Sequence, residues 1–156
     1  MIKIEIPDRE IIQAEHLVLD YNGTLAIDGI LIPGVEDRLN TLADKMTIHV
    51  VTADTFGKAR QSLSNILCSC DVIHGKNHQQ YKKEFISQLR AEKVIAIGNG
   101  QNDALMVKEA VLGIVLIQAE GCSVKTLMNA DVVCSTIVEA LDLLNNPLRI
   151  TATLRV

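Results

Sequence analysis

The sequence has no tryptophan, and aromatic residues make up only 3% of its 156 residues. Hydrophobic residues nevertheless amount to 48% of the chain, so the core has to be built mainly from Val, Ile, Leu and Ala. Strands that are covered on both faces have this aliphatic composition. The length suits a single domain with a substantial core. Composition and length together therefore favour an α/β protein with a parallel sheet.

The chain also lacks a long hydrophobic run and an excess of positive charge. The longest apolar run, at 111–117, has the length of a strand, whereas a membrane-spanning helix needs about 20 residues. The first six residues alternate apolar and polar side chains and contain no hydrophobic region of a signal peptide. The net charge of −4 argues against a nucleic-acid partner. We expect a cytoplasmic protein that binds neither nucleic acid nor membrane.

Cysteine is scarce, and its four copies lie in or beside apolar segments. The simplest interpretation is that they are reduced, buried thiols. The alternative is a zinc site, because Cys68, Cys70, His74 and His78 form the pattern C-x-C-x3-H-x3-H. The two cysteines are one residue closer than structural zinc sites usually have them, and alternation along a strand would scatter these side chains. We favour the first interpretation.

Apolar runs alternate with helical patterns along the whole chain. The predicted strands are 2–6 (at a sheet edge), 16–20, 47–52, 71–73, 93–97, 112–117 and 131–134. The predicted helices are 34–45, 56–67 (capped by Thr55 or Asp54), 77–90, 102–110, 122–129 and 136–145. This repeat of strand and helix predicts a doubly wound parallel sheet in one domain that covers residues 1–156.

Two segments do not fit this repeat. Residues 25–32 have the pattern of a small hairpin around Asp28 and Gly29. The tail, at 147–156, alternates apolar and polar residues from Arg149 onward and is predicted to be strand-like. Its simplest structural role is an additional edge strand of the same sheet.

Polar residues gather at the carboxyl ends of the predicted strands, which is where ligands bind in doubly wound sheets. They are Asp20, Asn22, Thr24, Thr52, Asn99 and Asp103, with Lys82 in an intervening helix. An isolated ionised Asp20 beside the core costs several kcal/mol unless a partner compensates its charge. A carboxylate in this position therefore indicates a functional site rather than packing.

Each of these residue types has a role in phosphoryl transfer. A carboxylate can attack phosphorus and form an acyl phosphate, and a magnesium ion held by carboxylate and carbonyl oxygens reduces the repulsion between that carboxylate and the phosphate. Hydroxyl, ammonium and turn N–H groups hold the phosphate oxygens. Taken singly, each residue has an ordinary explanation as a turn, a strand-end cap or a solvated helix residue. Their joint occurrence at the expected ends of the elements favours a phosphoryl-transfer site.

Several segments also carry a family resemblance. The segment 20–25, DYNGTL, resembles the D-K-T-G-T-L of P-type ATPases, and the segment 98–104, GNGQNDA, resembles their G-D-G-V-N-D-A. The segments 112–114 and 130–132 resemble later parts of the same domain. The chain is thus similar to the haloacid dehalogenase (HAD) superfamily, and within it to the soluble relatives of the P-type ATPase phosphorylation domain. The resemblance implies a HAD-like Rossmannoid fold and a hydrolase that acts on phosphate monoesters.

The resemblance implies a set of magnesium ligands. Asp20 corresponds to the nucleophile that becomes phosphorylated and that also binds the metal. The backbone carbonyl of Asn22 corresponds to a second ligand, and Asp103 to a third. Asn99 stands where the family usually has an aspartate, and its amide oxygen is the remaining candidate ligand.

The resemblance also implies a phosphate-binding set, which comprises Thr24, Thr52, Ala53 and Lys82. Lys82 is preferred to its neighbour Lys83, because the family pattern has an apolar residue four positions after the lysine and a leucine seven positions after it. Ile86 and Leu89 satisfy this spacing from Lys82.

Two of the usual acidic positions of the family are amides here. In most phosphatases of this superfamily, an aspartate at the position of Asn22 protonates the leaving group and then activates water. General acid–base catalysis of this kind contributes about 10²–10⁴-fold, so we expect a slow phosphatase or a persistent aspartyl phosphate. The alternative is a catalytically weakened phosphate-binding or regulatory module. A C2-haloacid dehalogenase is disfavoured, because that reaction uses no metal and Asp103 suits one.

The spacing of the motifs leaves no room for a cap domain, since 32 positions separate Asp20 from Thr52 and 30 separate Thr52 from Lys82. We therefore expect an open crevice. Its substrate would be a phosphorylated small molecule, recognised with the help of a neighbouring subunit, or a phosphorylated macromolecule. The hairpin at 25–32 and the tail at 149–155 are the candidate contacts of a homo-oligomer.

Overall fold

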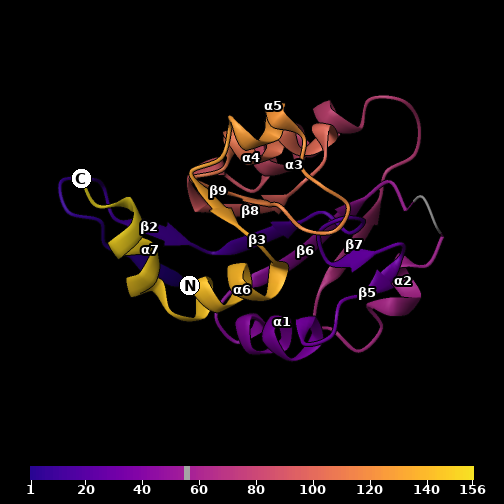
Figure 1. The fold of residues 1–156 in the computed structure, drawn as a ribbon, viewed down its shortest axis with the longest axis horizontal. Helices are drawn as coiled ribbons and strands as arrows, with labels where there is room; N and C mark the ends of the chain where they lie inside the picture. Colours follow the sequence, from indigo (N-terminus) through magenta and orange to yellow (C-terminus); the bar gives the residue numbers. More distant parts are fainter. Residues whose placement is uncertain (55–56) are drawn as a thin grey trace.

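The computed structural model describes residues 1–54 and 57–156, and a parallel sheet of six strands forms its centre (Figure 1). The strands are β3 (His16–Leu19), β6 (Thr47–Thr52), β7 (Ser69–Val72), β8 (Val94–Gly98), β9 (Leu112–Leu116) and β10 (Val132–Cys134). They lie in the order β10-β9-β8-β3-β6-β7, and all neighbouring pairs are parallel. The predicted doubly wound sheet is confirmed.

The order of the strands makes β3 the switch point of the sheet. From β3 the chain continues to β6 and β7 on one side and then crosses over to β8, β9 and β10 on the other. Leu19, the last residue of β3, pairs with Val50 of β6 and with Ile97 of β8. Ligands of such sheets bind beyond the carboxyl ends of the strands at this point. Asp20, which follows Leu19, is therefore at the position where a ligand site is expected.

Helices cover both faces of the sheet (Figure 1). One face carries α1 (Val35–Ala43) and α6 (Ile137–Asn145), and the other carries α3 (His78–Gln88), α4 (Ala104–Glu109) and α5 (Val124–Leu127). All residues of β8 and β9 are buried, as the aliphatic composition predicts for strands covered on both faces. Short 3-10 helices, η1 (Ala91–Lys93) and η2 (Gln101–Asp103), lie before and after β8.

Two small antiparallel sheets lie outside the central sheet. The predicted hairpin is present as β4 (Ala26–Ile27) and β5 (Ile30–Leu31). The predicted first strand is β1 (Ile2–Ile4), but it pairs with β2 (Ile12–Ala14) and not with the central sheet. Its alternating isoleucines are buried in the main core beside Ile12. The strand β2 has only three residues and is not among the predicted strands.

The prediction of a strand-like tail is wrong. The tail forms a helix, α7 (Pro147–Leu154), that packs against β1 and α6. Proline is favourable in the first turn of a helix, and Ile150 is buried on the side that faces the core. The hydroxyl of Thr151 donates to the carbonyl of Glu5, just after β1, at 2.8 Å, and that of Thr153 donates to the carbonyl of Arg149 at 3.0 Å. The hydroxyls of both β-branched residues therefore have partners in the helical conformation.

The predicted helix at 56–67 is much shorter in the structure. The helix α2 spans Ala59–Ser62, and the predicted start at 56 and the alternative cap Thr55 lie outside the described residues. The N-cap of α2 is Lys58, so the predicted cap Asp54 is not in the capping position. Its carboxylate nevertheless accepts the N–H groups of Lys58 and Ala59, at 3.0 and 3.1 Å. Beyond α2 the chain is held by Asn40 of α1, whose amide bonds the backbone of residues 65 and 67.

None of the helices in the described ranges combines the length and the apolar character that a bilayer crossing requires.

Two histidines connect side chains of three neighbouring strands, with His16 on β3, His49 on β6 and Ser69 on β7. His16 Nδ1 lies 3.1 Å from His49 Nε2, and His49 Nδ1 lies 3.0 Å from Ser69 Oγ. The ring of Phe85 from α3 packs edge-on against His49, with 5.5 Å between the ring centroids. Burial lowers the pKa of both histidines, and the proximity of His16 lowers the pKa of His49 further. Glu15 and Asp71 oppose these shifts, whereas Arg90 adds to that of His16.

This pair predicts a loss of stability in acid. Because the folded pKa values lie below the unfolded value of about 6.5, the stabilisation is present above that pH and is lost as the pH falls through the folded values. We expect His49→Gln to flatten the decline of the free energy of unfolding between about pH 7 and pH 5. Urea unfolding across this range measures it. The exposed His74→Gln is the control, and an unchanged slope in His49→Gln would contradict the prediction.

Candidate active site

The ammonium group of Lys82 lies between the carboxylates of Asp20 and Asp103. Its Nζ donates to Asp20 Oδ1 at 2.5 Å and to Asp103 Oδ1 at 2.7 Å. The side chains of Lys82 and Asp103 are fully buried, and that of Asp20 is 8% exposed. Three charged residues that are far apart in the sequence thus form one buried cluster, which reaches solvent through Asp20.

Each residue of the cluster is positioned by a different element. Asp20 follows β3, and its backbone N–H donates to Ile97 of β8 at 3.1 Å. Lys82 lies on the inner face of α3, on the same side as the buried Ile86. Asp103 ends η2 and packs directly against Gly98, where an added Cβ would come within 2.6 Å of the Asp103 carboxyl carbon. Glycine at the end of β8 therefore allows the third charge to approach.

The charges in this cluster do not balance, since two carboxylates share one ammonium. Burial raises the pKa of Asp20 to about 7, and the neighbouring Asp103 contributes to the rise, while Lys82 opposes it. For Lys82 burial lowers the pKa, but the two carboxylates outweigh burial and the net change is upward. Lys82 is therefore a permanent cation here. No further cation pairs with either carboxylate in the described part of the chain, so the cluster has the charge to accept one more.

The second oxygen of Asp103 shapes the loop after β8. Oδ2 accepts the backbone N–H groups of Asn99 and Gly100, at 3.0 and 2.9 Å. The carbonyl of Gly100 in turn accepts a hydrogen bond from the hydroxyl of Thr126, at 2.6 Å. One carboxylate thus holds both the lysine and the loop, which fixes its orientation in the cluster.

The chain after Asp20 forms a tight turn. The carbonyl of Tyr21 accepts the N–H groups of Thr24, Leu25 and Ala26, at 3.2, 2.8 and 2.9 Å. Gly23 has a φ of +78°, and a Cβ there would collide with the amide of Asn99, so the turn requires glycine. In the described structure, the side-chain oxygen of Asn22 is buried and has no hydrogen-bond partner.

Asn99 connects this turn to the loop after β9. Its Oδ1 accepts the hydroxyl of the buried Thr24 at 3.2 Å, and its Nδ2 donates to the carbonyl of Gly121 at 3.0 Å. Both the oxygen and the nitrogen of the Asn99 amide therefore form hydrogen bonds within the chain. An aspartate in this position would lose the donor to Gly121.

Thr52 and Ala53 lie at the end of β6, next to β3. Thr52 is 1% exposed, and its Oγ1 accepts the N–H of Asp54 at 3.0 Å. Ala53 is half-buried and follows it directly. Because Leu19 and Val50 are paired, these residues are at the same edge of the sheet as Asp20.

Sequence reasoning missed two residues that support the site, Gln118 and Thr126. Gln118 donates to the carbonyls of Gly23 and Thr24, at 2.7 and 2.8 Å. Gln118 is the first polar residue after the apolar run that contains β9, so the same strand-end rule that indicated Asp20 would have found it. Thr126 is on α5 and has no such signal.

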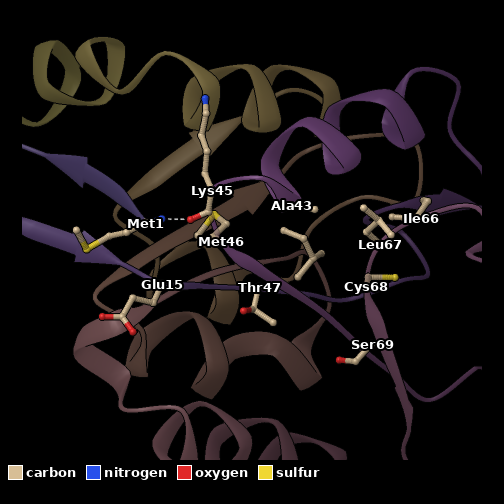
Figure 2. A pocket seen from close by; sticks show the side chains of 11 residues that line it. Met1, Glu15, Ala43, Lys45, Met46, Thr47, Ile66, Leu67, Cys68 and Ser69 are labelled. Atoms are coloured by element: carbon tan, nitrogen blue, oxygen red, sulfur yellow. Dashed lines mark hydrogen bonds between the residues drawn. The ribbon is translucent and has the colours of Figure 1, made fainter.

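A cavity of about 730 Å³ lies on the opposite edge of the sheet, at the amino ends of β6 and β7 (Figure 2). Its apolar lining includes Met46, Ile66 and Leu67, and Glu15 and Ser69 are at its border. The charged cluster lies at the carboxyl ends of the strands, so this cavity is separate from it.

The four residues of the possible zinc pattern, Cys68, Cys70, His74 and His78, are not brought together as a metal site. Within the described ranges, no group of three or more His, Cys, Asp or Glu side chains has an arrangement that could hold a metal ion.

The shared lysine predicts a large effect on stability. We expect Lys82→Met to lower the free energy of unfolding by about 3–5 kcal/mol, because two buried carboxylates then lack a counter-charge. Urea unfolding without added metal measures this, and the double variant Asp20→Asn/Lys82→Met should regain part of the loss. The neighbouring Lys83→Met is the matched control, since Lys83 is 39% exposed and pairs with Glu109 only at 3.8 Å. Equal losses in the two lysine variants would contradict the prediction.

Several solved structures with a similar fold are phosphatases. The chain aligns with 3-deoxy-D-manno-octulosonate 8-phosphate phosphatase of Moraxella catarrhalis, in complex with magnesium, phosphate and KDO, at a TM-score of 0.66 and 18% identity, covering 91% of this chain and 94% of that one. The cobalt-bound deoxy-D-mannose-octulosonate 8-phosphate phosphatase of Haemophilus influenzae aligns at a TM-score of 0.65 and 15% identity, covering 90% of this chain and 92% of that one. A phosphoserine phosphatase in its apo form aligns at a TM-score of 0.64 and 13% identity, covering 83% of this chain and 98% of that one. At these identities the likeness concerns the fold.

Two archaeal proteins are related in sequence. The uncharacterized protein MJ0073 of Methanocaldococcus jannaschii is 46% identical in an alignment of 78 positions that covers 47% of this chain and 84% of that protein. The uncharacterized protein MJ0072 of the same organism is 44% identical over 39 residues, which are 25% of this chain and 89% of that protein. Residues 3–110 match the haloacid dehalogenase-like hydrolases. The chain, in which the matched segment forms most of the parallel sheet, therefore belongs to the haloacid dehalogenase-like hydrolase family.

Proposed function

We propose that this protein is a magnesium-dependent phosphoryl-transfer enzyme of the phosphatase type, with Asp20 as its nucleophile and phosphate monoesters as its substrates. The observation that carries this proposal is the cluster in which Lys82 bridges Asp20 and Asp103. It presents a carboxylate at the switch point of the sheet, next to a permanent cation and a second carboxylate. Phosphoryl transfer uses a nucleophile, a cation for the phosphate oxygens and a metal ligand in this proximity.

Magnesium fits the charge and the donors of this cluster. Two carboxylates and one ammonium leave a negative charge that a cation would compensate, and oxygen donors are what magnesium prefers. The proposed ligands are Asp20, the backbone carbonyl of Asn22, Asp103 and the amide oxygen of Asn99. The Asn99 oxygen already accepts Thr24 and would use its second lone pair. When bound, the ion supplies positive charge between the nucleophile and the phosphate.

The reaction begins with attack by a carboxylate oxygen of Asp20 on phosphorus. A bond forms between Asp20 and phosphorus, the ester P–O bond breaks, and the leaving oxygen takes its proton from water. Lys82 and the hydroxyls of Thr24 and Thr52 would bind the phosphate oxygens, with the backbone at Ala53 as a further donor. Water then attacks the phosphorus of the aspartyl phosphate, which releases phosphate and restores Asp20.

Asn22 is the expected reason for slow turnover. An amide has no acidic proton for the leaving group and cannot deprotonate the attacking water, and both steps gain from general acid–base catalysis. The side chain is nevertheless part of the tight turn at 21–26 that follows Asp20, the nucleophile turn, and its oxygen is buried. We propose that Asp20 is phosphorylated more readily than it is dephosphorylated.

A second candidate function is a phosphate-binding or regulatory module that has lost turnover. It is favoured by the amides at 22 and 99, and by the hydrogen bonds that engage both ends of Asn99. Incubation with acetyl phosphate and magnesium, followed by mass spectrometry, separates the two. Phosphorylation of Asp20 with slow release of phosphate supports the enzyme, and stable phosphorylation or none supports the module.

The partners follow from the proposed site. We propose that the substrate is a phosphorylated small molecule bound with the help of a neighbouring subunit, or a phosphorylated macromolecule. Ile30 of the hairpin is 71% exposed, and Leu148 of α7 is 82% exposed, which supports these two segments as contacts of a homo-oligomer. Light scattering measures the assembly.

Restoring the acid at position 22 should accelerate turnover. We expect Asn22→Asp to hydrolyse an aryl phosphate at least about tenfold faster than the wild type, because it supplies a general acid and base. Steady-state assays with magnesium measure the rate. Unchanged or slower turnover would count against the role assigned to Asn22.

Removing the nucleophile should abolish the reaction. We expect Asp20→Asn to show neither turnover nor the mass gain from acetyl phosphate, because an amide forms no acyl phosphate. The variant should remain folded, since it removes a buried negative charge. Circular dichroism provides this control, and activity that survives the substitution would refute the assignment of Asp20.

A further inference from the structure

Gln118 uses its whole side-chain amide to connect two parts of the structure. Nε2 donates to the carbonyls of Gly23 and Thr24, at 2.7 and 2.8 Å. Oε1 accepts the N–H of Ile137, the first residue of α6, at 3.1 Å. A primary amide has two N–H donors, and here each has a carbonyl partner. The side chain therefore links the nucleophile turn to the amino end of α6.

These bonds fix two consecutive peptide groups. A peptide group is planar, so a bond to the carbonyl of Gly23 orients the N–H of Thr24, and a bond to the carbonyl of Thr24 orients the N–H of Leu25. Both of these N–H groups donate to the carbonyl of Tyr21. The peptide groups on either side of Thr24 are thus held by Tyr21 inside the turn and by Gln118 outside it.

The position of Gln118 is itself well defined. The neighbouring Ile117 donates its N–H to Cys134 at the end of β10, at 3.0 Å. Ile137 lies in the first turn of α6, whose capping box joins Thr136 and Glu139. The Gln118 amide therefore holds the turn that follows Asp20 in a fixed position relative to the end of β9 and to α6.

We propose that Gln118 is a positioning residue that holds the nucleophile turn in the geometry required for phosphoryl transfer to Asp20. The proposal rests on the proposed function for its chemical consequence. Gln118 donates to two carbonyls of the turn, and within residues 1–54 and 57–156 it forms no hydrogen bond with the charged groups of the cluster. Its effect is transmitted through the backbone at Thr24, whose hydroxyl is one of the proposed phosphate contacts.

The test compares two substitutions of similar shape. Gln118→Glu keeps an acceptor for Ile137 but presents a carboxylate oxygen to two carbonyls, and Gln118→Met removes both donors without adding charge. We expect the rate of Asp20 phosphorylation, at saturating acetyl phosphate and magnesium, to fall by about 10- to 100-fold in Gln118→Glu and by less in Gln118→Met. The amides of Thr24 and Leu25 should exchange their hydrogens faster in both variants, as NMR would show.

Asn40→Asp is the matched control, because it makes the same chemical change at the other end of the molecule. Asn40 donates to the carbonyl of Asn65 at 3.1 Å and accepts the N–H of Leu67 at 2.9 Å. We expect it to lose stability without slowing phosphorylation. Wild-type rates in Gln118→Glu, or equal slowing in Asn40→Asp and Gln118→Glu, would overturn the proposal.

Hydrogen exchange separates this proposal from the proposed function. If the wild type is not phosphorylated, the proposed function fails. Faster exchange of Thr24 and Leu25 in Gln118→Glu would then still support the role of Gln118 in shaping the turn. Unchanged exchange would overturn that role, whatever the activity of the wild type.

Discussion

The structure depends on one lysine that two buried carboxylates share. Lys82 bonds Asp20 and Asp103 at 2.5 and 2.7 Å, and through them it joins α3 to the end of β3 and to η2. Buried charges are costly unless they are paired, so these three elements have to meet in one arrangement. The same arrangement leaves a negative charge uncompensated. The interaction that orders the carboxyl edge of the sheet is thus also the one that prepares it to bind a cation.

Around this charged centre, neutral amides define the geometry. Asn99 joins Thr24 to Gly121, and Gln118 joins the same turn to α6. An amide can donate and accept at once, whereas a carboxylate only accepts. Where the family usually has an acid at position 99, this protein therefore has a cross-link between two loops. Compared with an aspartate, the amide reduces the charge near the proposed metal and adds the hydrogen bond to Gly121, which a carboxylate cannot donate.

The sequence predicted the elements whose signal is local. The strand at 47–52 has the predicted limits, and the core positions Val35, Leu39 and Leu42 of α1 are buried as their spacing predicts. The errors have tertiary causes. The tail is a helix whose Ile150 packs in the core and whose Thr151 hydroxyl bonds the carbonyl of Glu5, although its β-branched residues resemble a strand. Asn40 of α1 bonds the non-helical chain that follows the short α2, and the three-residue β2 pairs with β1.

The sequence by itself determined the class of fold, the strand ends that carry Asp20, Thr52 and Asn99, and the amide chemistry at position 22, because these follow from residue type and periodicity. Only the tertiary structure decided that Lys82 lies between two carboxylates, that both ends of the Asn99 amide are engaged, and that Gln118 reaches the nucleophile turn. The sequence separation between the bonded residues ranges from 21 to 95 positions. Side-chain hydrogen bonds over such separations depend on how the elements pack, and a local sequence pattern does not encode this packing.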